Sequence, residues 1–185
     1  AHFGDTTLTD SILGQQFRYA AESFFQVNLP VYEQTLRDMS QSIDTSPIVD
    51  LYSGVGSIGL SIGKNNPTTL VEINEFAVRE MRENIKNLDS QAEAILAPSE
   101  KALDHISSQA TIIVDPPRAG LHADVTQQLL DVQPPRIIYL SCNPVTQARD
   151  IALLASHYAI GYHKGYNFFP RTPHIEHLVV LDKKM

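Results

Sequence analysis

The chain has 185 residues, enough for one substantial domain with a full hydrophobic core. No apolar run approaches the roughly 20 residues that span a bilayer, and no signal-peptide pattern opens the chain, so we expect no membrane contact. A single cysteine excludes an internal disulfide framework and favours a reducing, cytoplasmic setting. The formal net charge of −7 argues against strong nucleic-acid binding by this segment alone. We expect a monomer.

The first 28 residues predict a short β-rich lead-in, with extended segments at 6–8 and 16–19. We interpret it as the remnant of a linker to an N-terminal region that is absent from the chain. From Leu29 to about Gln41 a helical pattern opens the domain that we expect over residues 29–185.

Apolar, β-branched runs then alternate with helical segments. The predicted strands are Ile48–Leu51, Thr68–Val71, Ala94–Leu96, Thr111–Val114 and Arg136–Leu140, and the predicted helices are Ile58–Lys64, Glu75–Leu88, Ser99–Ile106, His122–Val132 and Val145–Ala155. This alternation predicts right-handed βαβ units and a mostly parallel sheet in an α/β fold. Two last strand-like segments, Tyr158–Tyr166 and His174–Asp182, have no helix-length spacer and predict an antiparallel pair that completes the sheet.

A glycine loop follows the first strand of the alternating part. Gly54, Gly56 and Gly59 match the pattern G-x-G-x-x-G, which is a weak signal by itself, and the helix that follows offers free backbone N–H groups. Glu72 ends the next strand, where an acidic side chain can accept both hydroxyls of an adenosine ribose. A nicotinamide dinucleotide and S-adenosylmethionine both present that ribose. Asp50, just before the loop, favours S-adenosylmethionine, whose sulfonium and amino groups are cationic.

The only cysteine, Cys142, lies where a strand ends and a helix begins. Asn143 is a favoured helix N-cap residue and Pro144 suits the first helical position. The helix dipole and free N–H groups at this point favour a thiolate, the nucleophilic form of cysteine. A lone cysteine is also commonly an inert core residue, but Asp115, at the end of another strand, is expected on the same rim of the sheet.

Five motifs, in this order along the chain, resemble those of the RNA 5-methyluridine methyltransferases, which act on transfer or ribosomal RNA. They are Ser23-Phe24-Phe25-Gln26-Val27-Asn28, Asp50-Leu51-Tyr52-Ser53-Gly54-Val55-Gly56, Asp115-Pro116-Pro117-Arg118, Ser141-Cys142-Asn143-Pro144 and Pro173-His174-Ile175-Glu176. The resemblance implies a Rossmann-like, seven-stranded S-adenosylmethionine-dependent methyltransferase fold with an antiparallel last strand. Many members also carry an N-terminal RNA-binding barrel, for which this chain is too short.

The resemblance also implies roles for individual residues. Cys142 would be the nucleophile and Glu176 the general base. The implied cofactor contacts are Gln26, Tyr52, Gly54, Gly56, Ser57, Glu72 and Asp115, and the implied substrate-positioning residues are Asp115, Arg118 and Asn143. Family members often meet the adenine with Asp or Asn after the third strand, where this chain has Pro98, so Ser99 or backbone atoms would take that part.

The chemistry is consistent with these residue types. Carbon 5 of uracil is a poor nucleophile, and addition of a thiolate at carbon 6 makes carbon 5 nucleophilic. A base must then remove the proton from carbon 5, and Glu176 suits this step if its neighbours raise its pKa. Arg118 could bind phosphate, bind the base or pair with Asp115.

Other interpretations of the chain are a nicotinamide-dependent oxidoreductase, which leaves Cys142 and Glu176 without a role, and a non-catalytic nucleotide- or RNA-binding module. An adenine-N6 methyltransferase would need an aromatic residue where Arg118 stands. Paired phenylalanines such as Phe24 and Phe25 could stack on flipped bases, although core packing is their commoner fate. We expect no metal site, because His174 and Glu176 lack a third clustered ligand.

Overall fold

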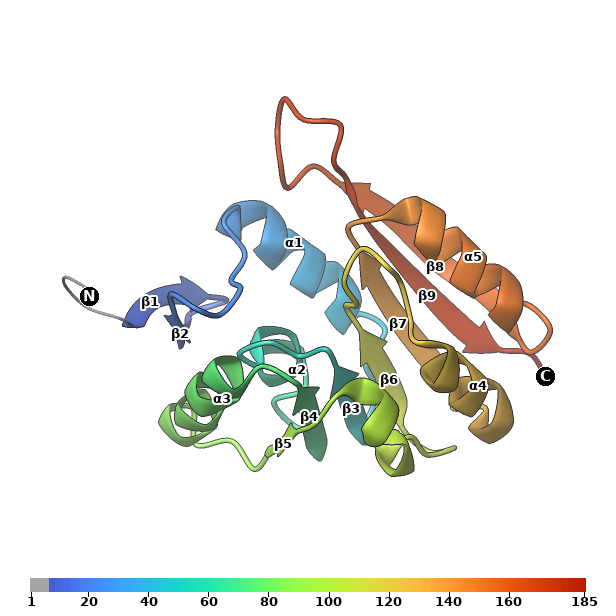
Figure 1. Ribbon diagram of the computed structural model, residues 1–185, viewed down its shortest axis with the longest axis horizontal. Coiled ribbons are helices and arrows are strands. Elements are labelled where there is room, and N and C mark those ends of the chain that lie inside the picture. Colours follow the sequence, from blue (N-terminus) through green and yellow to red (C-terminus); the bar gives the residue numbers. More distant parts are fainter. Residues whose placement is uncertain (1–6) are drawn as a thin grey trace.

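A seven-stranded sheet forms the centre of the computed structural model, which describes residues 7–185 (Figure 1). In spatial order the strands are β5 (Glu93–Leu96), β4 (Thr68–Glu72), β3 (Ile48–Leu51), β6 (Thr111–Val114), β7 (Arg136–Ser141), β9 (Glu176–Lys183) and β8 (Tyr158–Tyr166). The first five run parallel, and β9 pairs antiparallel with both β7 and β8. This confirms the mostly parallel α/β sheet with an antiparallel last strand.

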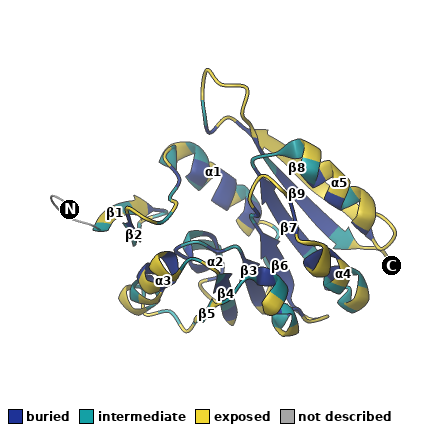
Figure 2. Cartoon of the chain, viewed as in Figure 1, coloured by how far each residue is buried: buried dark blue, intermediate teal, exposed yellow. Residues whose placement is uncertain are grey.

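Helices cover both faces of the sheet. The helices α1 (Leu29–Ser40), α2 (Ser57–Ile62) and α3 (Glu75–Asn87) share one hydrophobic cluster, and α4 (Ala123–Val132) and α5 (Pro144–Leu154) contribute to the other. Side chains alternate between the faces, so Ile113 belongs to the first cluster while Ile112 and Val114 belong to the second. Both faces are covered, which is why the central strands are mostly apolar and are buried in Figure 2.

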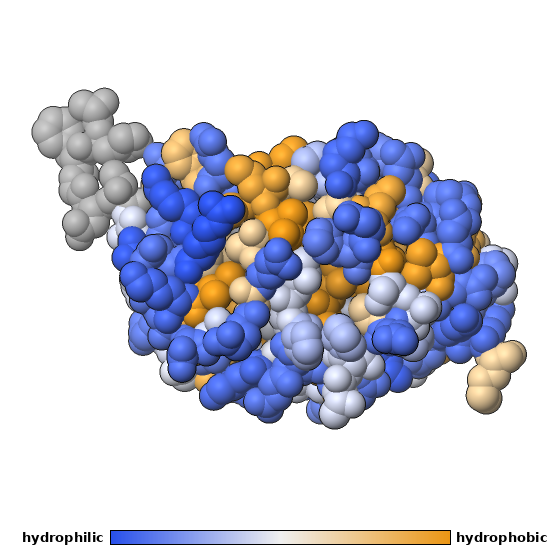
Figure 3. All heavy atoms as spheres, turned by 90° about the horizontal axis from the view of Figure 1, so that it is seen from below, coloured by the Kyte–Doolittle hydropathy of each residue, from blue (hydrophilic) through white to orange (hydrophobic). Residues whose placement is uncertain are grey.

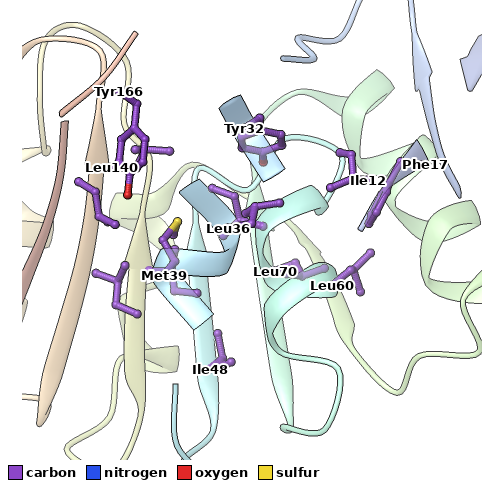
Figure 4. Close-up of a cluster of buried hydrophobic side chains, with 14 of the residues drawn as sticks. Ile12, Phe17, Tyr32, Leu36, Met39, Ile48, Leu60, Leu70, Leu140 and Tyr166 are labelled. Carbon is purple, nitrogen blue, oxygen red and sulfur yellow. The ribbon is translucent and has the colours of Figure 1, made fainter. Parts of the chain in front are cut away.

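The first cluster holds α1 against the sheet. In Figure 4, Tyr32, Leu36 and Met39 of α1 lie between the sheet residue Leu140 and the more distant Phe17. All five side chains are at most 2% exposed. Burying a side chain of this size contributes roughly 1.5–3 kcal/mol, so the cluster fixes the helix that precedes the first strand of the sheet.

The lead-in is a hairpin of β1 (Thr7–Ile12) and β2 (Gln15–Ala20), which pair in a separate two-stranded sheet. The earlier of the two predicted extended segments includes Thr6, which lies outside the described residues. Asn84 of α3 accepts a hydrogen bond from the backbone N–H of Arg18 at 2.7 Å and donates one to its carbonyl oxygen at 2.9 Å. The hairpin therefore docks on α3, and the proposed division at residue 28 stays a prediction.

The helix predicted over Ser99–Ile106 is wrong. Two short 3₁₀ turns, η1 (Ser99–Lys101) and η2 (Leu103–His105), replace it, because the backbone of Ala102 leaves the helical region at φ −119°. Ala102 and Ile106 both bury their side chains in the second hydrophobic cluster.

The surface is more varied than the core. On the face shown in Figure 3, hydrophobic residues gather along the middle, between hydrophilic flanks. Within residues 7–185, no helix has the length and apolar character needed to cross a bilayer.

Candidate active site

A cavity of about 600 Å³ opens at the rim where the parallel strands end. Eight of the predicted site residues line it, namely Gln26, Tyr52, Gly54, Glu72, Asp115, Arg118, Cys142 and Glu176. Four of them lie at or just after the carboxyl ends of β3, β4, β6 and β7, as expected for a ligand site in an open α/β sheet. Glu176 joins them because β9 is antiparallel: its amino end meets the carboxyl end of β7, where Ser141 pairs with His177.

The glycine loop is held in a left-handed turn. Tyr52, Gly54 and Gly56 have φ values of 62°, 57° and 84°, and such a conformation is costly for a residue with a bulky side chain such as Tyr52. Glu72 stabilises the turn by accepting hydrogen bonds from the N–H groups of Gly54 at 2.9 Å and Asn74 at 2.8 Å. This network ties the loop to the end of β4 and leaves both on the wall of the cavity.

Gly54 and Gly56 have different structural roles. No atom lies within 4 Å of the place where a Cβ on Gly54 would be, so this residue leaves open space at the cavity wall. A Cβ on Gly56 would meet Leu60, Leu70 and Met81 at 3.0–3.2 Å. Gly56 is therefore required for packing, and among the predicted cofactor contacts it is the one that faces the core.

Asp50 does not reach the cavity. Its side chain is fully buried and accepts a hydrogen bond from the N–H of Gly59 at 2.9 Å. Burial, together with the charge of Glu72, raises the pKa of Asp50 to about 7. The expectation that Asp50 faces cationic groups of the cofactor was wrong, because its side chain points under the amino end of α2.

Gln26 lies at the opposite wall of the cavity. It is 8% exposed, and its side-chain carbonyl oxygen has no hydrogen-bond partner among the described residues. A buried, unpaired acceptor of this kind is costly unless a ligand satisfies it. Ser57 lines a small adjoining pocket together with Gln26 and Asp115, and its hydroxyl group is 2.8 Å from that of Tyr32.

The reactive groups lie on the β6, β7 and β9 side. Glu176 is 4% exposed, and burial raises its pKa to about 7, against a smaller lowering by Arg118. Burial also raises the pKa of Asp115 well above its usual value, and the charges of Glu176 and Asp50 act in the same direction. A raised pKa is the condition under which Glu176 suits the role of a base.

The pKa of the Cys142 thiol differs from the value that the following helix predicts. Asn143 caps α5 by accepting a hydrogen bond from the N–H of Val145, and Pro144 occupies the first turn, as predicted. The pKa of the thiol is nevertheless raised, by burial and then by the charges of Glu176 and Asp115, while Arg118 lowers it. The expected thiolate-favouring environment was wrong, because burial, followed by the charges of Glu176 and Asp115, raises the pKa of the thiol.

The loop that carries Arg118 is fastened to α5. Asn143 and Thr146 both donate hydrogen bonds to the carbonyl oxygen of Arg118, at 2.9 and 3.0 Å. Asp150 accepts hydrogen bonds from the N–H of Leu121 and the hydroxyl group of Tyr139, at 2.9 and 2.8 Å. Among the ion pairs of the described residues, none joins Arg118 to Asp115, so its guanidinium remains available to a ligand.

Comparisons with known proteins agree with this geometry. A family model described as methyltransferase small domain matches residues 33–135, and one described as tRNA (uracil-5-)-methyltransferase matches residues 99–184. An RNA methyltransferase of Lactiplantibacillus plantarum, described as uncharacterized, is 34% identical over 98% of this chain, which covers 42% of that relative. The solved structure of the Pyrococcus abyssi tRNA (uracil-54, C5)-methyltransferase with S-adenosyl-L-homocysteine has a TM-score of 0.87 at 32% identity, over 97% of this chain and 45% of that one.

The chain belongs to the methyltransferases, because the methyltransferase small domain model matches more than half of it, and it is similar to tRNA (uracil-5-)-methyltransferases over its carboxyl-terminal part. It spans less than half the length of the relatives just described. The solved structure of the M. jannaschii tRNA m1G37 methyltransferase has a TM-score of 0.74 at 15% identity, over 100% of this chain and 58% of that one. At this identity the likeness shows the fold alone.

Members of this family depend on S-adenosylmethionine, and the cavity fits that cofactor. Glu72 and Tyr52 form a polar wall, and the unpaired acceptor of Gln26 suits the cationic amino group of the methionine part. The predicted cofactor is thus confirmed by the family, although the argument from Asp50 was not. Within residues 7–185, no group of three metal-ligating side chains is close enough to hold an ion.

Sequence reasoning missed some residues of the site and misjudged others. Ile73 and Glu100 line the cavity, and their only sequence signal is their position next to residues that were predicted. Phe24 is 70% exposed at the cavity, whereas its neighbour Phe25 stacks on Tyr19 with ring centroids 4.2 Å apart. The two rings of this pair therefore have different roles, which adjacent positions in a sequence do not distinguish.

Proposed function

We propose that the chain methylates carbon 5 of a uridine in transfer or ribosomal RNA, with S-adenosylmethionine as methyl donor. The observation that supports this proposal best is that one cavity brings Cys142 and the buried carboxyl group of Glu176 next to the glycine loop. A cofactor site alone would need neither of these two groups. The match to the family model for tRNA (uracil-5-)-methyltransferase, over residues 99–184, covers both.

The first task of the protein is to hold the two reactants. Glu72, Tyr52 and Gln26 would bind the adenosine and methionine parts of the cofactor at the β3–β4 side of the cavity. When bound there, S-adenosylmethionine supplies an electrophilic methyl group. The uracil ring would lie between it and Cys142, near Asp115, whose pKa is raised by burial and then by the charges of Glu176 and Asp50, and whose carboxyl group in its protonated form would donate a hydrogen bond to a ring carbonyl oxygen.

The second task is nucleophilic activation. The sulfur of Cys142 forms a bond to carbon 6, and the electrons of the 5,6 double bond move toward carbon 5 and the carbonyl oxygen at carbon 4. Carbon 5 would then take the methyl group as the bond between that group and the sulfonium sulfur breaks, which leaves S-adenosylhomocysteine. The guanidinium of Arg118, which lowers the pKa of the thiol, favours the thiolate that this step needs.

The third task is proton removal. The carboxylate of Glu176 takes the proton from carbon 5, the double bond forms again, and the bond between sulfur and carbon 6 breaks to release Cys142. A base with a pKa of about 7 is well matched to neutral conditions, because a large fraction of it is ionised and it still binds a proton readily.

The test is to incubate the purified chain with labelled S-adenosylmethionine and total RNA, and to analyse the digested nucleosides. We expect label in 5-methyluridine. Label in 5-methylcytidine or a methylated purine would contradict the uridine assignment. Cofactor binding without any RNA methylation would instead favour the non-catalytic binding module.

A further inference from the structure

A second cavity, of about 240 Å³, lies beside the main one. The two share Arg118 and Cys142, so Cys142 stands at the boundary between them. Asn143, His174 and hydrophobic residues complete the lining of the second cavity. The connection between β8 and β9, which rises above the rim of the sheet in Figure 1, contributes His174 to its lining.

The two cavities differ in charge. The main cavity is lined by four carboxyl groups, those of Glu72, Glu100, Asp115 and Glu176. None of these lines the second cavity, whose titratable nitrogen-bearing side chains are Arg118 and His174. A guanidinium nitrogen of Arg118 lies 3.4 Å from Nδ1 of His174, and both side chains are exposed. In a chain with a net charge of −7, this is a local site for an anion.

The position of Cys142 suggests which anion this is. In the proposed reaction its sulfur bonds to carbon 6 of uracil, and carbon 6 is next to the ring nitrogen that carries the ribose. A base in the main cavity therefore directs its sugar toward Cys142 and the boundary. We propose that the second cavity binds a phosphodiester group of the RNA backbone next to the target uridine, through Arg118 and His174. This inference rests on the proposed RNA substrate.

The donors of the second cavity are held in place before any ligand arrives. The backbone of Arg118 is fixed by Asn143 and Thr146, as described above. The N–H of His174 donates a hydrogen bond to the hydroxyl group of Thr172 at 3.2 Å. Donors that are positioned in advance lose less conformational entropy on binding, which is expected of a site that selects one phosphate of a flexible strand.

The test measures binding of a five-nucleotide RNA with one central uridine to the full chain, with fluorescence anisotropy over a series of salt concentrations. His174→Ala should weaken binding about three- to tenfold and reduce the slope of log Kd against log salt concentration by about one. His157→Ala is the matched control, because His157 is an exposed histidine that immediately precedes β8, at the end of this strand far from Tyr166, which pairs with Glu176. It should bind as the wild type does.

The phosphate itself is identified with RNAs in which one of the two phosphates that flank the uridine is a neutral methylphosphonate. One of these RNAs should bind the wild type less tightly than the unmodified RNA does. This loss of affinity should be smaller in His174→Ala, and smallest in the double variant that also carries Arg118→Gln. Equal losses in the wild type and in His174→Ala, or no binding of the unmodified RNA to the wild type, would overturn the inference. Because the measurement is of binding, it stands apart from the methyl-transfer test. If the effect of the methylphosphonate depends on His174 but no 5-methyluridine forms, the proposed reaction alone is refuted. If 5-methyluridine forms but the effect of the methylphosphonate does not depend on His174, the phosphate site alone is refuted.

Discussion

Two glutamates on opposite sides of the rim differ in their hydrogen bonds. On the β3–β4 side, Glu72 accepts hydrogen bonds from the N–H groups of Gly54 and Asn74. On the β7–β9 side, the carboxyl group of Glu176 has no hydrogen-bond partner among the described residues. Glu72 thus stays half-buried in a backbone cradle, and Glu176 is buried with its pKa raised to about 7. The first arrangement holds a carboxyl group in one position, as binding requires. The second keeps a carboxyl group ready to exchange a proton, as catalysis requires.

The same contrast applies to the other residues of the rim. The cofactor side is built from a turn whose backbone conformation is fixed by glycines and by Glu72, so its shape is set before a ligand binds. On the reactive side, the charge of Glu176 adds to burial in raising the pKa of Asp115, and the charges of Glu176 and Asp115 add to burial in raising the pKa of Cys142. A change on the first side should therefore alter affinity, and a change on the second should alter chemistry.

Replacing the nucleophile should have the largest effect. In Cys142→Ala we expect methyl transfer to fall by roughly 10³-fold or more, because no group remains to activate carbon 5. Cofactor affinity, measured by calorimetry, should stay within about twofold, since the β3–β4 side is intact. Covalent trapping by RNA that contains 5-fluorouridine should disappear. A trapped adduct in this variant would show that Cys142 is not the nucleophile.

Replacing the base should have the next largest effect. Glu176→Gln should reduce turnover about 10²- to 10⁴-fold and accumulate a covalent complex with RNA, visible on a denaturing gel, because the adduct forms but cannot lose its proton. The matched control is Glu72→Gln. It should raise the Kd for S-adenosylmethionine and accumulate no such complex. Turnover of Glu176→Gln within tenfold of the wild type would rule out this base.

The contrast also explains how far the sequence predicts the site. Strands and their carboxyl ends follow from β-branched runs and turn residues, so Tyr52, Glu72, Asp115 and Cys142 could be placed on one rim. The direction of a side chain beyond such a turn is not encoded in periodicity. For that reason Asp50 and Gly56 were expected at the ligand, and both belong to the packing beneath it.

Long-range effects were the other limit. The prediction of a thiolate at Cys142 used only the helix that follows it, whereas the charges that raise the thiol pKa come from Asp115 and Glu176, on distant segments. The hydrogen bonds of Asp150 to Leu121 and Tyr139, which fasten the loop beside the site, likewise join elements that no local pattern connects. Such pairings are decided by the folded sheet.

Asp50 provides a test of the cofactor side through stability. Its pKa in the folded state is about 7, above the ordinary value of about 3.9, so the unfolded chain loses this proton first as pH rises. The contribution of Asp50 to stability should therefore fall between about pH 4 and pH 7, by at most about 1.4 kcal/mol per pH unit.

Asp50→Asn removes this dependence while keeping an oxygen that can accept the hydrogen bond from Gly59. We expect the free energy of unfolding of the variant, relative to wild type, to increase from pH 5 to pH 7 in urea titrations. Asp104→Asn, at an exposed position, controls for the amide substitution itself. A relative stability that stays constant over the same range would mean that Asp50 is already ionised in the folded protein.

The smallest expected effect is a shift in the titration of Cys142, and it bears directly on the reactive side. Alkylation by iodoacetamide requires the thiolate, and the chain has no other cysteine, so the rate at each pH reports this thiol alone. Glu176→Gln removes a negative charge that raises the thiol pKa, so the midpoint of the rate profile should move to lower pH. Arg118→Met should move it to higher pH, and Glu100→Gln, on the same cavity, is the matched control. If the Glu176 and Arg118 variants both titrate as wild type, the charges on this side do not act on one another, and the contrast between the two sides of the rim fails.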